Sequence, residues 1–118
     1  MSRSAWDGIV SRVLDQTGVS ATAFYAPGKG ARGVAEARRL AVYLARCELN
    51  IPRRQVARYM GKSVQTIRLA CHHTETARED RGFDRFLDAL AEGLHTEIHL
   101  PQLAAASAVG ALGSALAA

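Results

Sequence analysis

The sequence has few aromatic residues and no run in which β-branched and polar residues alternate. Aromatic side chains make up 6% of its 118 residues, although apolar side chains together make up 48%. The missing alternation argues against strands, and the length allows one modest core but no second catalytic domain. Three prolines and ten glycines punctuate stretches of helical periodicity. We therefore predict an all-α protein, a compact bundle of five to six helices.

The sequence also lacks paired cysteines and a recognisable leader. Cys47 and Cys71 show neither a disulfide nor a CxxC spacing and fall at apolar positions of expected helices, which predicts two reduced core residues. Trp6, Asp7 and Arg12 interrupt the only stretch that could serve as a signal peptide. A cytoplasmic location is expected.

Signs of catalysis and of metal binding are equally scarce. No pair of carboxylates and no nucleophile beside a base indicates an enzyme, so neither catalytic residues nor a cofactor are expected. His95 and His99 stand four residues apart and could share a helix face, but they lack a zinc spacing. We expect them to be surface histidines and expect no metal site.

The last part of the chain, from 98 to 118, carries no charged residue and consists chiefly of alanine, glycine and serine. It has too few large apolar side chains for a membrane-spanning helix. We expect a folded domain over 1–96. Over 97–118 we expect a flexible tail or a small-residue helix that contacts a partner or a second copy of the chain.

The charged residues are segregated along the chain. Between Ala26 and Cys71 ten basic residues accompany two acidic ones, whereas from His72 onward three arginines accompany seven acidic residues. A basic centre beside an acidic flank is typical of a nucleic-acid-binding protein, although an anionic membrane or an acidic protein would be attracted too. Double-stranded DNA is the partner that this distribution favours.

The first third of the chain is expected to form two helices and a loop. One helix begins at Ser4, and a short second helix begins at Ser20. The glycine-rich stretch from 26 to 33 then predicts a flexible basic loop in which Lys29 and Arg32 are free to move.

A third helix, from about 34 to 49, carries an apolar stripe of alanine and leucine that should face the core. Its arginines, Arg38, Arg39 and Arg46, are expected to lie off that stripe. A last helix after Gly82 should close the core with one apolar face. That face consists of Phe83, Phe86, Leu87, Leu90 and Leu94.

The strongest pattern runs from Arg53 to Ala77. Counting from its first residue as position one, Ala57 stands fifth, Gly61 ninth and Ile67 fifteenth. A small residue lets two helices approach, a glycine can adopt the left-handed conformation of a tight turn, and a β-branched residue fills the angle between the helices. The spacing predicts a helix-turn-helix; a helical hairpin without DNA-binding function is the alternative. The other residues expected to be buried are Val56, Met60, Val64, Ala70 and Cys71.

Ser63 is a suitable N-cap for the second helix of this unit, whose opposite face is polar. Gln and Arg side chains can form bidentate contacts with adenine and guanine edges in the major groove, and Ser and Thr suit phosphates near a helix N-terminus. An ordinary solvated face is the alternative. Within a helix-turn-helix we expect this face to contact DNA. Its residues are Lys62, Ser63, Gln65, Thr66, Arg68, Leu69 and His72.

A family resemblance rests on two stretches. Residues 37–46 read ARRLAVYLAR, and Gly61 and the segment TIRLAC at 66–71 follow at suitable spacing. They resemble the C-terminal DNA-binding domain of the bacterial replication initiator DnaA, a helix-turn-helix domain of the Trp repressor superfamily. The similarity covers about 9–94. Stand-alone regulators similar to this domain include activators of gene transfer agent clusters, which work with RNA polymerase.

The resemblance implies that a basic loop enters the minor groove and that the helix-turn-helix reads the adjacent major groove. These roles would fall on Lys29 and Arg32 in the loop and on residues 62–68. The family's Asp-His pair is missing here, and the segment that matches the family signature, 61–67, is one residue shorter, so the initiator's target sequence is not expected. Arginines on the flanking helices complete the expected DNA-binding set, namely Arg38, Arg53 and Arg54.

The function expected of the helix-turn-helix domain over 1–96 is therefore sequence-specific binding of double-stranded DNA in the nucleoid. The protein would be a transcription regulator that acts with RNA polymerase or another transcription factor. A replication-origin or nucleoid-associated factor is the alternative among DNA-binding proteins. A protein interaction module is the alternative from another class. Its basic face would dock an acidic protein, and its tail would supply an oligomer contact.

Overall fold

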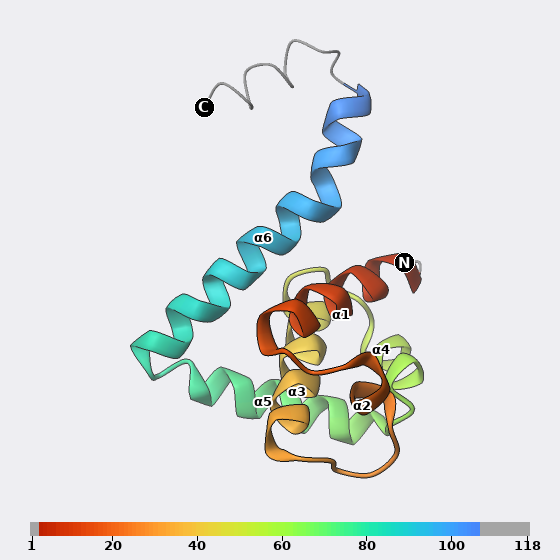
Figure 1. The fold of residues 1–118 in the computed structure, drawn as a ribbon, viewed down its shortest axis with the longest axis vertical. Helices are drawn as coiled ribbons and strands as arrows, with labels where there is room; N and C mark the ends of the chain where they lie inside the picture. Colours follow the sequence, from red (N-terminus) through yellow and green to blue (C-terminus); the bar gives the residue numbers. More distant parts are fainter. Residues whose placement is uncertain (1–2, 107–118) are drawn as a thin grey trace.

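The computed structural model describes the backbone of residues 3–106 and the side chains of residues 3–94. Over these residues the chain is all helical and contains no strand, as predicted. Figure 1 shows the six helices, with α6 projecting beyond the others. They are α1 (Arg3–Thr17), α2 (Ala21–Tyr25), α3 (Arg32–Cys47), α4 (Arg53–Met60), α5 (Val64–Ala77) and α6 (Arg81–Ala106).

Several helix boundaries differ from the prediction. Helix α1 begins at Arg3, before the expected start at Ser4, and α3 runs from Arg32 to Cys47 instead of from about 34 to 49, so that its start lies within the stretch predicted as a loop. Helix α6 runs to Ala106, past the domain boundary expected after residue 96. The rest of the predicted tail, 107–118, and the side chains of His95 and His99 lie outside the described residues. Within that described part, every helix is too short or too polar to cross a membrane.

Helix α3 forms the centre of the fold, because it packs against α1, α2, α4 and α5 (Figure 1). Its predicted stripe is confirmed as core. The five residues of that stripe are at most 6% exposed, namely Ala37, Leu40, Ala41, Leu44 and Ala45. Helix α6 packs mainly on α1, through Leu87, Leu90 and Leu94 among the buried residues.

Trp6 joins three helices. Its indole ring is fully buried, donates a hydrogen bond from Nε1 to the Tyr25 hydroxyl at 3.0 Å, and stacks on Tyr59 with ring centroids 5.6 Å apart. A buried indole needs a partner for its N–H group, and Tyr25 supplies one. This contact fixes α1 to α2 and α4.

Tyr43 and Arg78 tie the end of α5 to α3 and α6. The Tyr43 hydroxyl donates to Glu75 Oε2 at 2.6 Å and accepts from Arg78 Nη1 at 3.1 Å, while Arg78 also donates to Asp84 and Asp88 at 2.6 and 2.5 Å. Burial, and then the bond to Glu75, raise the pKa of Tyr43 to about 12. The hydrogen bond to Asp84 raises the pKa of Arg78 as well.

Three expected core positions are exposed. Cys47 is exposed because the chain turns back at Asn50, with φ 54°, and buries Ile51 over the end of α3 instead. Val64 is 38% exposed at the first residue of α5. Phe86 is also 38% exposed, because it lines an open pocket at the start of α6.

Candidate nucleic-acid interface

The turn between α4 and α5 has the geometry that the spacing predicts. Gly61 adopts the left-handed conformation, with φ 66° and ψ 35°, and its N–H group donates to the Arg58 carbonyl at 3.3 Å. The next N–H group, of Lys62, donates to the Ala57 carbonyl at 3.0 Å. Ala57 and Ile67 are 6% and 1% exposed. The left-handed conformation predicted for Gly61 and the burial predicted for Ala57 and Ile67 are therefore confirmed.

Ser63 caps α5, as predicted. Its Oγ atom accepts a hydrogen bond from the Thr66 backbone N–H at 3.1 Å and lies 3.0 Å from the Thr66 hydroxyl oxygen. This cap satisfies one of the backbone donors that would otherwise lack a partner at the helix start. The two hydroxyl groups thus hold the beginning of α5 in a defined shape.

The polar face of α5 is exposed along two turns. Gln65, Arg68 and His72 are exposed, and none of them forms a hydrogen bond or an ion pair with another described residue. Leu69, on the same face, is 57% exposed. The side that faces the core is anchored by Ile67 and, two turns later, by Thr74. The helix therefore presents these outward side chains while its inner side is held.

Arg38 differs from its prediction, because it is buried rather than exposed off the apolar stripe. Its guanidinium group uses all five N–H donors on backbone carbonyl oxygens of the segment from 23 to 29. The acceptors and distances are Phe24 at 2.9 Å from Nε, Gly28 at 2.5 Å and Lys29 at 3.2 Å from Nη1, and Ala23 at 3.1 Å and Ala26 at 2.7 Å from Nη2. A group committed in this way has no donor left for a phosphate, so we leave Arg38 out of the interface.

The basic loop is consequently held rather than free to move. The Arg38 bonds fix its carbonyl groups up to Lys29, and Gly28 and Gly30 take the left-handed φ values of 84° and 70° that the path requires. Lys29 is exposed on this loop. Arg32 begins α3 and forms an ion pair with Glu36 at 3.4 Å, with 93% of its side chain exposed. It therefore lies in a helix instead of the expected loop.

A groove of about 360 Å³ brings the loop and the start of α5 together. Lys29 lines it from the loop, Lys62 and Thr66 line it from the turn and α5, and Arg39 lines it from α3. These residues are as many as 37 positions apart in the sequence. The structure therefore unites Lys29 with Lys62 and Thr66, three of the predicted site residues.

Helix α4 adds a second basic surface. Arg53 and Arg54 are exposed at its first turn, as expected of residues that contact phosphates, and Arg58 is exposed one turn after Arg54. Arg58 was missing from the predicted site. The i, i+4 spacing from Arg54, opposite the buried Val56 and Ala57, is the sequence signal that could have identified it.

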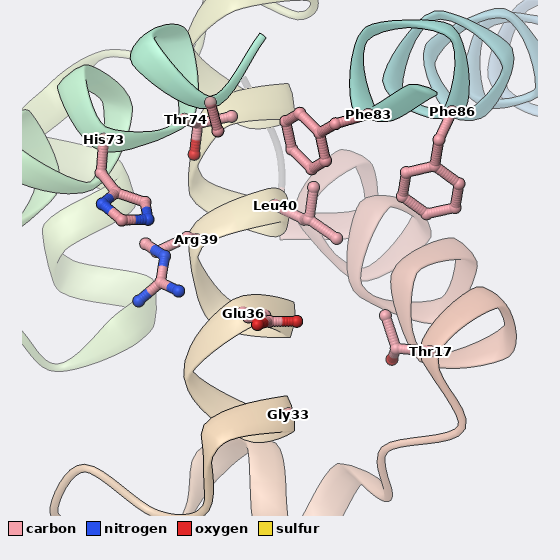
Figure 2. A pocket seen from close by; sticks show the side chains of 10 residues that line it. Thr17, Gly33, Glu36, Arg39, Leu40, His73, Thr74, Phe83 and Phe86 are labelled. Atoms are coloured by element: carbon pink, nitrogen blue, oxygen red, sulfur yellow. The ribbon is translucent and has the colours of Figure 1, made fainter. Parts of the chain in front are cut away.

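A separate pocket of about 430 Å³ lies where α1, α3, α5 and α6 meet. Figure 2 shows Leu40, Phe83 and Phe86 toward one end of it and Arg39 and His73 toward the other. No sequence pattern indicates this pocket, because four helices contribute to it. Among the side chains that the structure describes, no three His, Cys, Asp or Glu residues gather as metal ligands.

No family model, no curated protein and no solved structure matches this chain.

Proposed function

We propose that this protein binds double-stranded DNA and that α4 and α5 act as its helix-turn-helix, in a domain of the DnaA C-terminal kind. Helix α5 is the recognition helix in this proposal and enters the major groove, while α4 crosses the phosphate backbone. The proposal extends to a sequence-specific transcription regulator located in the nucleoid.

The residues divide into two groups by their chemistry. Gln65 and Arg68 have free amide and guanidinium groups that can read base edges, which gives specificity. Exposed basic residues other than Arg68 can position the protein on phosphates, which gives affinity. Lys29 lines the same groove as Lys62, which supports a phosphate contact from the loop on the side toward the minor groove. The phosphate-contacting set comprises Lys29, Arg53, Arg54, Arg58 and Lys62.

The observation that carries the proposal is the combination of a tight turn and a polar outer face. Gly61 sets the α4 and α5 helices close together over Ala57 and Ile67. The same arrangement leaves Gln65 and Arg68 exposed in a segment, 49–74, that contains no acidic residue. A hairpin that served only to fill the core would not need such an uninterrupted basic outer surface.

The test is the affinity for random-sequence duplex DNA, measured by fluorescence anisotropy across salt concentrations. With about four to six phosphates contacted, the logarithm of the association constant should fall with the logarithm of salt at a slope of about −4 to −5. Arg54→Ala should weaken binding to all sequences and make the slope shallower by about 1. The matched control is Arg85→Ala, which removes an exposed arginine on α6 and should leave binding unchanged. Absence of binding, or a flat salt response, would refute the proposal.

Selection of bound sequences from a random duplex pool distinguishes the two DNA-binding functions. A regulator selects one motif, whereas a nucleoid-associated factor enriches none or only base composition. In the selected motif, Arg68→Ala should cost about 1 to 3 kcal/mol of binding free energy and relax the preference at one position. An unchanged motif after both Arg68→Ala and Gln65→Ala would exclude α5 as the recognition helix.

A further inference from the structure

Leu69 is the most exposed of the large apolar side chains in the described part of the chain. It is 57% exposed, compared with 43% for Tyr25 and 38% for Val64 and Phe86. It lines none of the three pockets described for this structure. A single exposed leucine is common on protein surfaces, so its exposure alone indicates nothing. The exposed polar residues beside it on α5 make it a candidate contact residue.

Leu69 lies between groups that suit a DNA groove. It follows Gln65 by four residues and is adjacent in sequence to Arg68, and one further turn brings His72 onto the same side of α5. All three neighbours are exposed. The face therefore offers one apolar contact surrounded by hydrogen-bond donors.

The charge around this face restricts what can bind there. Residues 49–74 contain no aspartate or glutamate, and five basic residues accompany Leu69 in that segment. The occupant should therefore be anionic at its edges and apolar at one point. The major groove meets both requirements, because phosphates border it and the thymine C5-methyl group is its apolar element. A membrane surface fits less well, since it needs a broad apolar helix face rather than one leucine.

The spacing on the helix is compatible with base reading. Four residues of α-helix rise about 6 Å, and two base pairs rise about 7 Å. A helix that lies along the groove therefore brings Leu69 to a base pair roughly two steps from the one that Gln65 contacts.

We propose that Leu69 is a specificity-determining residue that contacts the C5-methyl group of a thymine in the major groove. This inference rests on the proposed function and adds the chemical class of the base that α5 selects at one position. The contact needs no rearrangement of α5, because the Leu69 side chain already lies outside the core.

The experiment removes the methyl group from the DNA and the leucine from the protein, separately and together. The motif selected by the wild-type protein is synthesised with each thymine replaced in turn by deoxyuridine, which keeps the hydrogen-bonding groups and lacks only the methyl. At one or two positions the replacement should weaken wild-type binding about fourfold, the effect of burying one carbon group. Leu69→Ala should bind thymine and uracil duplexes equally at those positions.

Two control variants separate this contact from general effects. Gln65→Ala should weaken binding but keep the thymine preference at the position that Leu69 contacts. Phe86→Ala removes another exposed apolar side chain, on α6, and should change neither affinity nor preference. Because Leu69 is exposed, its replacement should leave the helical circular dichroism signal unchanged.

The outcomes distinguish this inference from the proposed function. Specific DNA binding with equal affinity for thymine and uracil at every position, or a preference that persists in Leu69→Ala, would overturn the role of Leu69 alone. A selected motif without thymine, or no selected motif, would also overturn it. Failure to bind any duplex would refute the proposed function itself. Binding to anionic phospholipid vesicles that depends on Leu69, without duplex binding, would identify a membrane surface instead.

Discussion

Replacing Arg38 with methionine tests whether one side chain shapes the basic loop. The substitution keeps much of the aliphatic volume and removes all five N–H donors. The carbonyl groups of residues 23, 24, 26, 28 and 29 then lose their partner. We expect the protein to stay helical but to lose stability and the defined position of Lys29.

The magnitude follows from the burial of these bonds. A hydrogen bond from a charged donor contributes about 1.5 to 3 kcal/mol when fully buried. Only the bond from Nε to Phe24 is buried, whereas the other four are partly buried, so water can replace Arg38 there. We therefore expect a loss of about 3 kcal/mol rather than the sum of five full contributions. For a domain of this size that loss lowers Tm by about 12 to 24 °C.

The assay is thermal unfolding followed by circular dichroism, together with DNA affinity measured well below Tm. The control is Arg39→Met at the next position of α3, because the Arg39 guanidinium forms no hydrogen bond with another described residue. It should cost less than about 1 kcal/mol. Arg38→Lys should fall between, since an ammonium group has three donors and no planar fork. If Arg38→Met melts within about 4 °C of wild type, the loop does not depend on this residue.

Three further outcomes are expected. Gly61→Ala should lower the free energy of unfolding by about 1 to 2 kcal/mol, because alanine must adopt the strained φ of 66°. Nothing within 4 Å would obstruct its Cβ atom, so the loss comes from the backbone alone. Urea unfolding measures the loss, and an unchanged free energy of unfolding would contradict the strain. Ser63→Ala should cost about 1 kcal/mol through the lost N-cap, whereas Ser63→Asp should keep the stability, and equal losses in both would exclude capping. The pKa of Tyr43 rises from 10.0 to about 12 in the folded protein, so the unfolded chain loses this proton first and stability should fall between about pH 10 and 12. Tyr43→Phe should lack that fall, and parallel stability curves for the two proteins would contradict the raised pKa.

Much of the architecture could be predicted because it depends on local periodicity. The α3 stripe, the caps at Ser20 and Ser63 and the left-handed Gly61 are determined by residues within a few positions of one another. Such short-range patterns are the part of a fold that a single sequence expresses most directly.

The surroundings of Arg38 could not be predicted, because they depend on contacts 9 to 15 residues away. In sequence it resembles its neighbour Arg39, and nothing in the helical pattern distinguishes a buried arginine from an exposed one. The exposure of Phe86 could not be predicted from the sequence either. It occupies an apolar position of α6, but the neighbouring helices leave an open pocket beside it.

The structure also changes how much of the basic charge can act on DNA. Of the ten basic residues between 26 and 71, Arg38 is buried, and Arg39 and Arg46 are half-buried, with Arg46 donating to the Ile51 carbonyl at 2.9 Å. Seven exposed residues remain, so one copy of the chain that used all of them would give a salt slope of about −6. A steeper measured slope would therefore require either a second copy on the same DNA or contacts from exposed arginines outside this segment, such as Arg3 and Arg81. Analytical ultracentrifugation of the complex gives the number of protein copies on the DNA. The salt slope is then measured again at protein concentrations that change this number, which decides between one copy and two. The seven exposed residues are Lys29, Arg32, Arg53, Arg54, Arg58, Lys62 and Arg68.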